Sequence, residues 1–125
     1  MNEDFVTYEL AVKLKEKGFD EPCYGYYHCN GGNDSFELCG NGDRDFQNSK
    51  NRYRVAAPTI SQVLKWLREE KKIYLELVIV VDAEYMCDIY KIDARPIECL
   101  GSTEYYKTYE AAALAGIEYV IDNLI

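Results

Sequence analysis

Apolar and polar residues repeat with a helical period between Thr59 and Lys72. Thr59 and Gln62 form a Thr-x-x-Gln capping box, a pattern that satisfies two backbone amides at the start of a helix. The apolar stripe consists of Ile60, Val63, Leu64 and Leu67. The polar side opposite it consists of Lys65, Arg68, Glu69 and Lys72. Because one stripe is apolar, the segment predicts an amphipathic helix that packs on a core and leads into a strand at Ile73.

Two further helices are predicted near the two ends of the chain. Thr7 is placed to cap a helix of about three turns that ends at Gly18, with Phe19 folding back on it. Thr108 is placed to cap the last helix. The side chains available for burial are Leu10, Ala11 and Leu14 in the first helix, and Ala111, Leu114, Ala115, Tyr119, Val120 and Leu124 in the last.

The strongest strand pattern covers residues 73–81, and its expected partner covers residues 85–93. The connection between them determines which side chains share a face. An even-length turn around Ala83-Glu84 places Glu76 opposite Lys91, and moves Met86, Tyr90 and Ile92 to the apolar face. An odd-length loop gives the opposite arrangement of faces.

A second hairpin is expected earlier in the chain. Residues 23–29 are rich in aromatic side chains, residues 30–34 form a glycine-containing turn, and residues 35–39 form the returning strand. Residues 40–51 are polar and predict the longest loop, followed by a short strand at 53–56. Residues 94–107 predict a connection with room for one more short strand.

These elements predict an α+β fold in one domain over residues 1–125. Three helices accompany an antiparallel sheet of about four to five strands, in the order α-β-β-(β)-α-β-β-α. A chain of 125 residues with 48% hydrophobic content is long enough for one core of its own.

The charge of the chain is −8 and is unevenly distributed. Residues 1–43 carry three lysines against nine acids, and residues 73–125 carry three bases against ten acids. Residues 44–72 carry eight bases against three acids, so this basic segment is either a docking surface for an acidic partner or a solvated face. The overall acidity argues against general binding to nucleic acid.

The five cysteines are Cys23, Cys29, Cys39, Cys87 and Cys99. Their number is odd and no Cys-x-x-Cys spacing is present, which favours reduced thiols. No signal peptide and no membrane span is recognisable, so the expected location is cytoplasmic and no membrane partner is expected.

One group of residues resembles a metal site, because thiolate and imidazole are the ligands that zinc prefers. The group comprises Cys23, His28, Cys29 and Cys39. On a regular strand Cys23 and Cys29 lie about 20 Å apart, and His28 points to the opposite face from Cys29. Buried or partly exposed thiols are therefore the preferred interpretation, with zinc as the alternative.

Other motifs of catalysis or cofactor binding do not emerge. His28 is the single histidine, and no nucleophile elbow or phosphate-binding loop is present. Residues 41–52 begin like a calcium loop, but Phe46 and Arg52 stand where glycine and glutamate are needed. The sequence therefore predicts no catalytic residue and no cofactor.

The twelve tyrosines are too many to be buried with every hydroxyl satisfied. Tyrosine is enriched at protein interfaces because it offers a large contact area at a low cost in side-chain entropy. Ordinary packing at the edge of a core is the alternative. The candidate interaction residues are Tyr24, Tyr26, Tyr27, Tyr105 and Tyr106.

Three segments carry a resemblance to a known family: APTISQVLKWLREE at 57–70, YEAAALAGIEYV at 109–120, and DFV through GFD at 4–20. In these segments the chain resembles a family of short uncharacterised proteins of gut anaerobes, often encoded among prophage and other mobile-element genes. Residues 23–54 and 73–107 correspond to the variable parts of that family. The resemblance implies a cytoplasmic accessory protein and assigns no catalytic residue.

Three functions are consistent with the sequence. The favoured one is a non-enzymatic interaction module that binds a protein partner or a second copy of itself through its tyrosines. The second is an acidic mimic of nucleic acid that inhibits a host DNA-binding protein, which requires a continuous acidic stripe. The third is a small ligand-binding domain or enzyme with a pocket near His28, Asp88 or Glu76.

Overall fold

The computed structural model describes residues 4–40 and 42–125. The chain divides into two compact units, Met1–Thr59 and Ile60–Ile125. The α+β class is confirmed, but the predicted single sheet of four to five strands is wrong: the described residues form six strands in two three-stranded antiparallel sheets. The strands fall in two groups of three, one before and one after the second helix. The prediction that residues 1–125 form one domain stays a prediction.

The first unit contains helix α1 (Tyr8–Glu16), which begins and ends as the sequence predicts. The hydroxyl of Thr7 accepts a hydrogen bond from the backbone amide of Leu10 at 3.3 Å, and this caps the helix. Gly18 has a φ of +92°, a left-handed conformation that glycine adopts without strain. It turns the chain so that the amide of Phe19 donates to the carbonyl of Leu14 at 3.0 Å.

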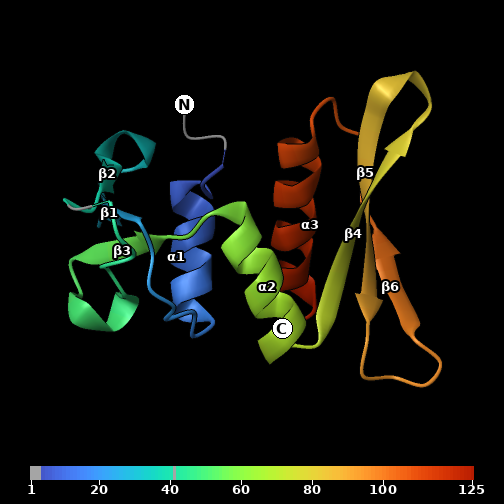
Figure 1. The fold of residues 1–125 in the computed structure, drawn as a ribbon, viewed down its shortest axis with the longest axis horizontal. Coiled ribbons are helices and arrows are strands. Elements are labelled where there is room, and N and C mark those ends of the chain that lie inside the picture. Colours follow the sequence, from blue (N-terminus) through green and yellow to red (C-terminus); the bar gives the residue numbers. More distant parts are fainter. Residues whose placement is uncertain (1–3, 41) are drawn as a thin grey trace. The chain divides into compact units, whose positions relative to one another are not determined.

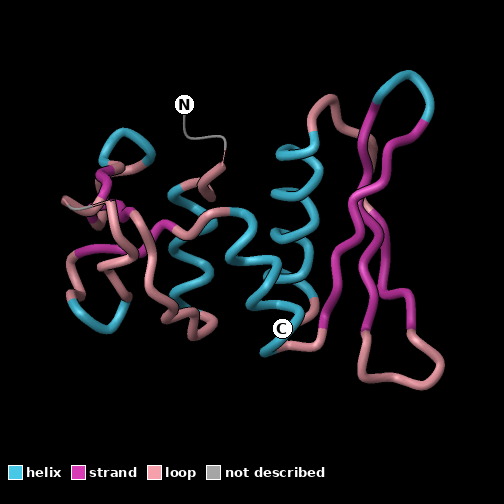
Figure 2. The backbone as a smooth tube through the Cα atoms, in the orientation of Figure 1, coloured by secondary structure: helices cyan, strands magenta, loops and turns pink. Residues whose placement is uncertain are grey.

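The sheet of the first unit consists of β1 (Gly25–His28), β2 (Glu37–Leu38) and β3 (Arg54–Ala57), in the order β2-β1-β3 (Figures 1 and 2). The hairpin predicted over residues 23–39 is confirmed as the β1–β2 pair. The short strand predicted at 53–56 is present at 54–57 and pairs with β1, which makes β1 the central strand. Two short 3-10 helices, η1 (Asn33–Ser35) and η2 (Asn48–Lys50), lie in the connections.

Asn48 fixes the connection between β2 and β3, which the sequence predicts only as a polar loop. Its side chain is buried, with 9% of its surface exposed. The amide nitrogen Nδ2 donates to the carbonyl of Phe19, and the oxygen Oδ1 accepts from the backbone amide of Ala56, both at 2.8 Å. One side chain therefore links the end of the α1 turn to strand β3.

The second unit contains α2 (Ile60–Glu70), β4 (Ile73–Val80), β5 (Glu84–Lys91), β6 (Glu98–Ser102) and α3 (Tyr109–Asn123), with strand order β4-β5-β6. Helix α2 begins directly after Thr59, as predicted. Its buried stripe includes Trp66 in place of the predicted Leu64, which is half-buried. Within this unit both helices pack against the β4–β5 hairpin.

The predicted register of the β4–β5 hairpin is wrong. The connection is η3 (Val81–Ala83), which has three residues and is therefore odd. Glu76 lies opposite Asp88 and not opposite Lys91. Because an odd loop reverses the faces, Cys87 and Ile89 are buried, while Met86 and Tyr90 lie on the other face of the sheet.

Helix α3 is capped as predicted, since the hydroxyl of Thr108 accepts from the amide of Ala111 at 3.1 Å. Its predicted buried face is wrong except for Val120: the buried residues are Ala112, Ala113, Gly116, Ile117, Val120 and Ile121. The reason lies at Gly116, where a Cβ atom would lie 2.7 Å from Sγ of Cys87. The helix approaches the sheet most closely where it has no side chain.

Candidate protein-interaction surface

The sheet of the first unit has two different faces. Residue pairing places His28 opposite Arg54 and Tyr27 opposite Val55. Because successive residues of a strand point to opposite faces, Tyr26, His28 and Arg54 share one face, and Tyr27 and Val55 share the other. Tyr27 contacts Tyr8 of α1 edge to face at 5.7 Å between ring centroids, so its face is the one covered by the helix. We call the opposite face the outer face.

Two arginines of the first unit lie over tyrosine rings, one on the outer face and one at the bend just before β1. The guanidinium carbon of Arg54 is 4.5 Å from the ring centroid of Tyr26, and that of Arg44 is 5.2 Å from the ring centroid of Tyr24. These distances fall within the range of cation–π attraction. We call these four residues, Tyr24, Tyr26, Arg44 and Arg54, the arginine–tyrosine surface.

A third pair of the same kind lies just before β3. The guanidinium carbon of Arg52 is 4.9 Å from the ring centroid of Tyr53, and its Nη2 atom donates to the Tyr53 hydroxyl at 2.7 Å. The backbone carbonyl of Tyr53 accepts from the amide of Cys29 at 3.0 Å, which joins this pair to the end of β1. Tyr53 is 64% exposed, so it adds accessible aromatic surface next to the end of β1.

The ring of Tyr26 is held by neighbours on several sides. Phe46, which is buried, packs against it at 5.3 Å between centroids, and His28 contacts it edge to face at 5.6 Å. Tyr26 is half-buried as a result. Because these contacts fix the ring of Tyr26, the Arg54 guanidinium that stacks on it is also held in a defined position.

One acid belongs to the same face. Glu37 lies opposite Tyr26 in the β1–β2 ladder, and its carboxylate bonds with Nε2 of His28. The hydrogen bond from His28 lowers the pKa of Glu37, and the positive charge of Arg54 lowers it further. Glu37 is therefore an anion at neutral pH, and the outer face carries both arginine charge and one carboxylate.

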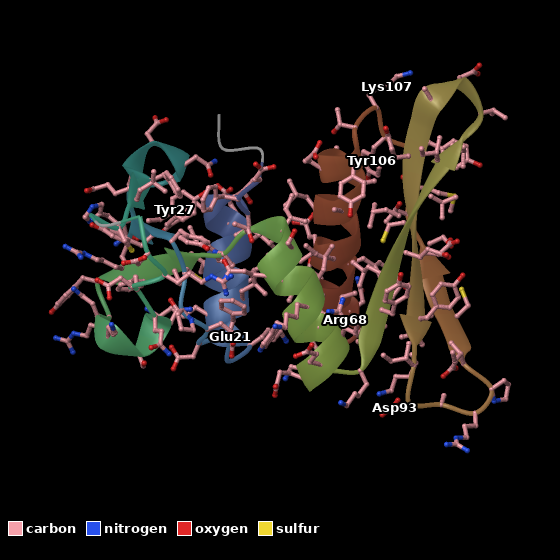
Figure 3. The ribbon with its side chains drawn as sticks, viewed as in Figure 1. Glu21, Tyr27, Arg68, Asp93, Tyr106 and Lys107 are labelled. Carbon is pink, nitrogen blue, oxygen red and sulfur yellow. The ribbon has the colours of Figure 1, made fainter. Side chains whose placement is uncertain are left out.

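Tyr27 differs from the other tyrosines predicted to be interaction residues. It is only 2% exposed, and its hydroxyl donates to the backbone carbonyl of Val6. Burial raises the pKa of Tyr27, so the phenol remains protonated. Figure 3 shows it within the first unit, beside α1. Tyr27 contributes to the core of this unit, whereas Tyr26 lies on the outer face and Tyr24 is half-buried in the bend just before β1.

Tyr105 and Tyr106 belong to the second unit, in the segment between β6 and α3, and Figure 3 labels Tyr106 there. Tyr106 exchanges two backbone hydrogen bonds with Tyr85, each 2.7 Å long, and is half-buried. Tyr105 is 57% exposed. The five predicted tyrosines are therefore divided between the two units.

The structure does not gather the four residues of the alternative zinc site into one group. Among residues 4–40 and 42–125, no cluster of three or more histidine, cysteine or acidic side chains is placed to hold a metal ion. His28 bonds Glu37, and the thiol of Cys29 donates to the carbonyl of Arg52 at 3.4 Å. Burial, with Cys39 nearby, raises the pKa of Cys23 to about 12, so this thiol stays protonated.

The tyrosines and the basic segment 44–72 are both apparent in the sequence, but their pairing is not. Arg44 and Arg54 lie in that segment, while Tyr24 and Tyr26 lie about 20 to 30 positions earlier. The available signal was the alternation along β1, which places Tyr26 on one face and Tyr27 on the other. Pairing of β1 with β3 brings Arg54 to Tyr26. The isolated β-bridge between Cys23 and Phe46 brings the segment that contains Arg44 close to Tyr24.

None of the helices in the described part of the chain is long and apolar enough to cross a membrane. The family resemblance of the three segments at 4–20, 57–70 and 109–120 stays a prediction. Comparison with family models, with curated proteins and with solved structures finds no match to this chain.

Proposed function

We propose that this protein is a non-enzymatic interaction module that binds another protein through the arginine–tyrosine surface. The observation that carries the proposal is the position of the Arg54 guanidinium, 4.5 Å from the Tyr26 ring on the face of the sheet opposite α1. Arginine and tyrosine are the residue types that most often dominate the free energy of protein–protein binding. Here they occur together in two stacked pairs, Arg54 with Tyr26 and Arg44 with Tyr24.

The surface is ordered before any partner arrives. Arginine normally loses about 2 kcal/mol of side-chain entropy when it is immobilised. Stacking on Tyr24 and Tyr26 restricts Arg44 and Arg54 in the free protein, so less of this entropy is lost on binding. The guanidinium groups can then form paired hydrogen bonds with carboxylates of a partner. We therefore expect the partner to present acidic side chains to this face.

The other two functions receive unequal support. A nucleic-acid mimic needs a continuous acidic stripe, whereas several acids are paired with bases: Asp45 with Lys50, Asp93 with Lys91 and Glu84 with Lys107. A ligand-binding role is favoured by one observation, a hollow beside Glu76 in the second unit.

An origin in a prophage or mobile element, and a cytoplasmic location, remain part of the proposal on the strength of the sequence resemblance alone.

The test is an affinity purification of the tagged protein from its native host, carried out with matched variants. Arg54→Lys keeps the positive charge and removes the planar group that stacks on Tyr26 and binds carboxylates in pairs. We expect this variant to lose the co-purifying partner by roughly tenfold or more, as for a residue that dominates binding. Mass spectrometry with an internal standard gives the yield.

Arg68→Lys is the matched control, because Arg68 is exposed in α2 and forms only a long contact, 3.9 Å, with the adjacent Glu69. It should retain the partner at the wild-type yield. Equal thermal unfolding of both variants excludes loss of the fold as the cause. Partner yields that are the same for Arg54→Lys and for the wild type would refute the proposed surface.

A further inference from the structure

The sheet of the second unit also has an outer face, opposite α3. Cys87 and Ile89 of β5 point towards the helix side, where Gly116 meets Cys87. Tyr74 pairs with Tyr90 and Glu76 pairs with Asp88, so these four side chains lie on the other side of the sheet. Tyr74 is exposed and Tyr90 is half-buried, so two aromatic rings are available there.

A hollow of about 280 Å³ lies on this face. The described residues that line it are Tyr74, Glu76, Tyr90, Ile92 and Ile97. One wall is aliphatic, two residues are aromatic, and one is a carboxylate. This combination matches the chemistry of a lysine side chain, which has a four-carbon apolar stem and a compact cationic end. Aromatic rings that surround a cation attract it through their negative faces.

The charges beside the hollow favour a cation. Glu76 and Asp88 are directly opposite each other in the ladder, where two like charges are unfavourable. The Tyr90 hydroxyl donates to Oε1 of Glu76 at 3.4 Å, and the Ser102 hydroxyl donates to Oδ1 of Asp88 at 2.6 Å. Burial raises the pKa of Tyr90, and the two carboxylates raise it further, which reflects the same negative potential.

The neighbouring loop carries charges of both signs. A second hollow, of about 550 Å³, is lined by residues 92–97 and shares Ile92 and Ile97 with the first. It contains one acid, Asp93, and one base, Arg95. Figure 3 shows Asp93 at the end of β5, and its carboxylate bonds with Nζ of Lys91 at 2.9 Å. Lys91 is therefore already paired with an acid outside the first hollow.

We propose that the hollow beside Glu76 binds a lysine side chain of a partner protein. The ammonium group meets the carboxylate of Glu76 and the rings of Tyr74 and Tyr90, while the stem packs on Ile92 and Ile97. This site lies in the second unit and does not depend on the arginine–tyrosine surface. It also prefers a basic partner segment, whereas the arginine–tyrosine surface prefers an acidic one.

The test compares two probes that differ only in the ammonium group. The isotope-labelled full chain is titrated with N-acetyl-lysine methylamide and, separately, with N-acetyl-norleucine methylamide, and the amide chemical shifts are followed. We expect saturable shifts confined to the hollow with the lysine probe and no saturable shift with norleucine. The lysine shifts should weaken as salt is added, because the attraction is partly electrostatic.

Glu76→Gln should weaken lysine binding by about threefold to fivefold, the effect of losing one exposed ion pair. Tyr74→Ala should weaken it as well, through loss of the cation–π contact. Glu104→Gln is the matched control, since Glu104 is an exposed acid between β6 and α3. Equal binding of both probes, no saturable shift with lysine, or an equal effect of Glu76→Gln and Glu104→Gln would overturn the proposal.

Discussion

Replacing Asn48 by alanine is expected to lower the free energy of unfolding by about 2–4 kcal/mol. The variant loses both side-chain hydrogen bonds, to the carbonyl of Phe19 and from the amide of Ala56. The buried amide of Ala56 is left without this partner, which costs about 1–3 kcal/mol, and the lost bond to the Phe19 carbonyl adds about 1 kcal/mol. Urea denaturation followed by circular dichroism measures the loss.

Two variants show whether the hydrogen bonds are the cause. Asn48→Asp has nearly the same shape and keeps the acceptor for Ala56, but it places a carboxylate against the Phe19 carbonyl, so it should also destabilise at pH 7. Asn123→Ala removes an exposed bond to the Tyr119 carbonyl and should change stability by less than about 0.5 kcal/mol. A loss of only that size for Asn48→Ala would contradict the assigned role of Asn48.

The second large effect is expected at Gly116 in α3. A Cβ atom at this position would lie 2.7 Å from Sγ of Cys87 and 3.0 Å from Cδ2 of Leu75. Valine adds two more carbons to a site that has no room for the first. We expect Gly116→Val to destabilise the protein by about 3 kcal/mol, the upper end of the usual cost of overpacking a core. Thermal and urea unfolding both measure it.

A double-mutant cycle identifies the contact that is responsible. Cys87→Ala removes the sulfur that the new side chain meets, so it should recover at least about 1 kcal/mol in the Gly116→Val background. Ala115→Val, one residue earlier in α3 and half-buried, measures the cost of a β-branched residue in this helix, about 0.5 kcal/mol. If the two valine variants were equally stable, the close approach of α3 to β5 would be refuted.

Local features of the fold could be predicted because they depend on neighbouring residues. Thr7 and Thr108 cap their helices through a backbone amide three residues later, and Gly18 ends α1 for the same local reason. The hairpin at 23–39 was also predictable, since its turn residues lie next to each other in the sequence.

Features that depend on tertiary fit could not be predicted in this way. The register of β4 and β5 depends on whether Ala83 belongs to the loop or to a strand, a difference of one residue that reverses both faces. Helix α3 has apolar residues on most of its circumference, so its pattern does not select a buried face. The buried face of α3 is determined by the close fit of Gly116 against Cys87, which lies on strand β5.

The candidate site was predictable only in part. Alternation along β1 is sufficient to separate Tyr26 from Tyr27, although the sequence analysis grouped both as interaction residues. The partner of Tyr26, Arg54, is 28 positions away and meets it through the β1–β3 ladder. A pairing of this kind is a consequence of topology and leaves no local pattern in the sequence.

Site-specific photocrosslinking in the native host shows whether a partner protein binds at the arginine–tyrosine surface. A photoreactive phenylalanine replaces Tyr24 of the arginine–tyrosine surface, and in a second variant it replaces Glu16, which is exposed at the end of α1. We expect a discrete crosslinked protein from position 24 and none from position 16. Crosslinks of equal yield and identity from both positions, or none from position 24, would contradict it.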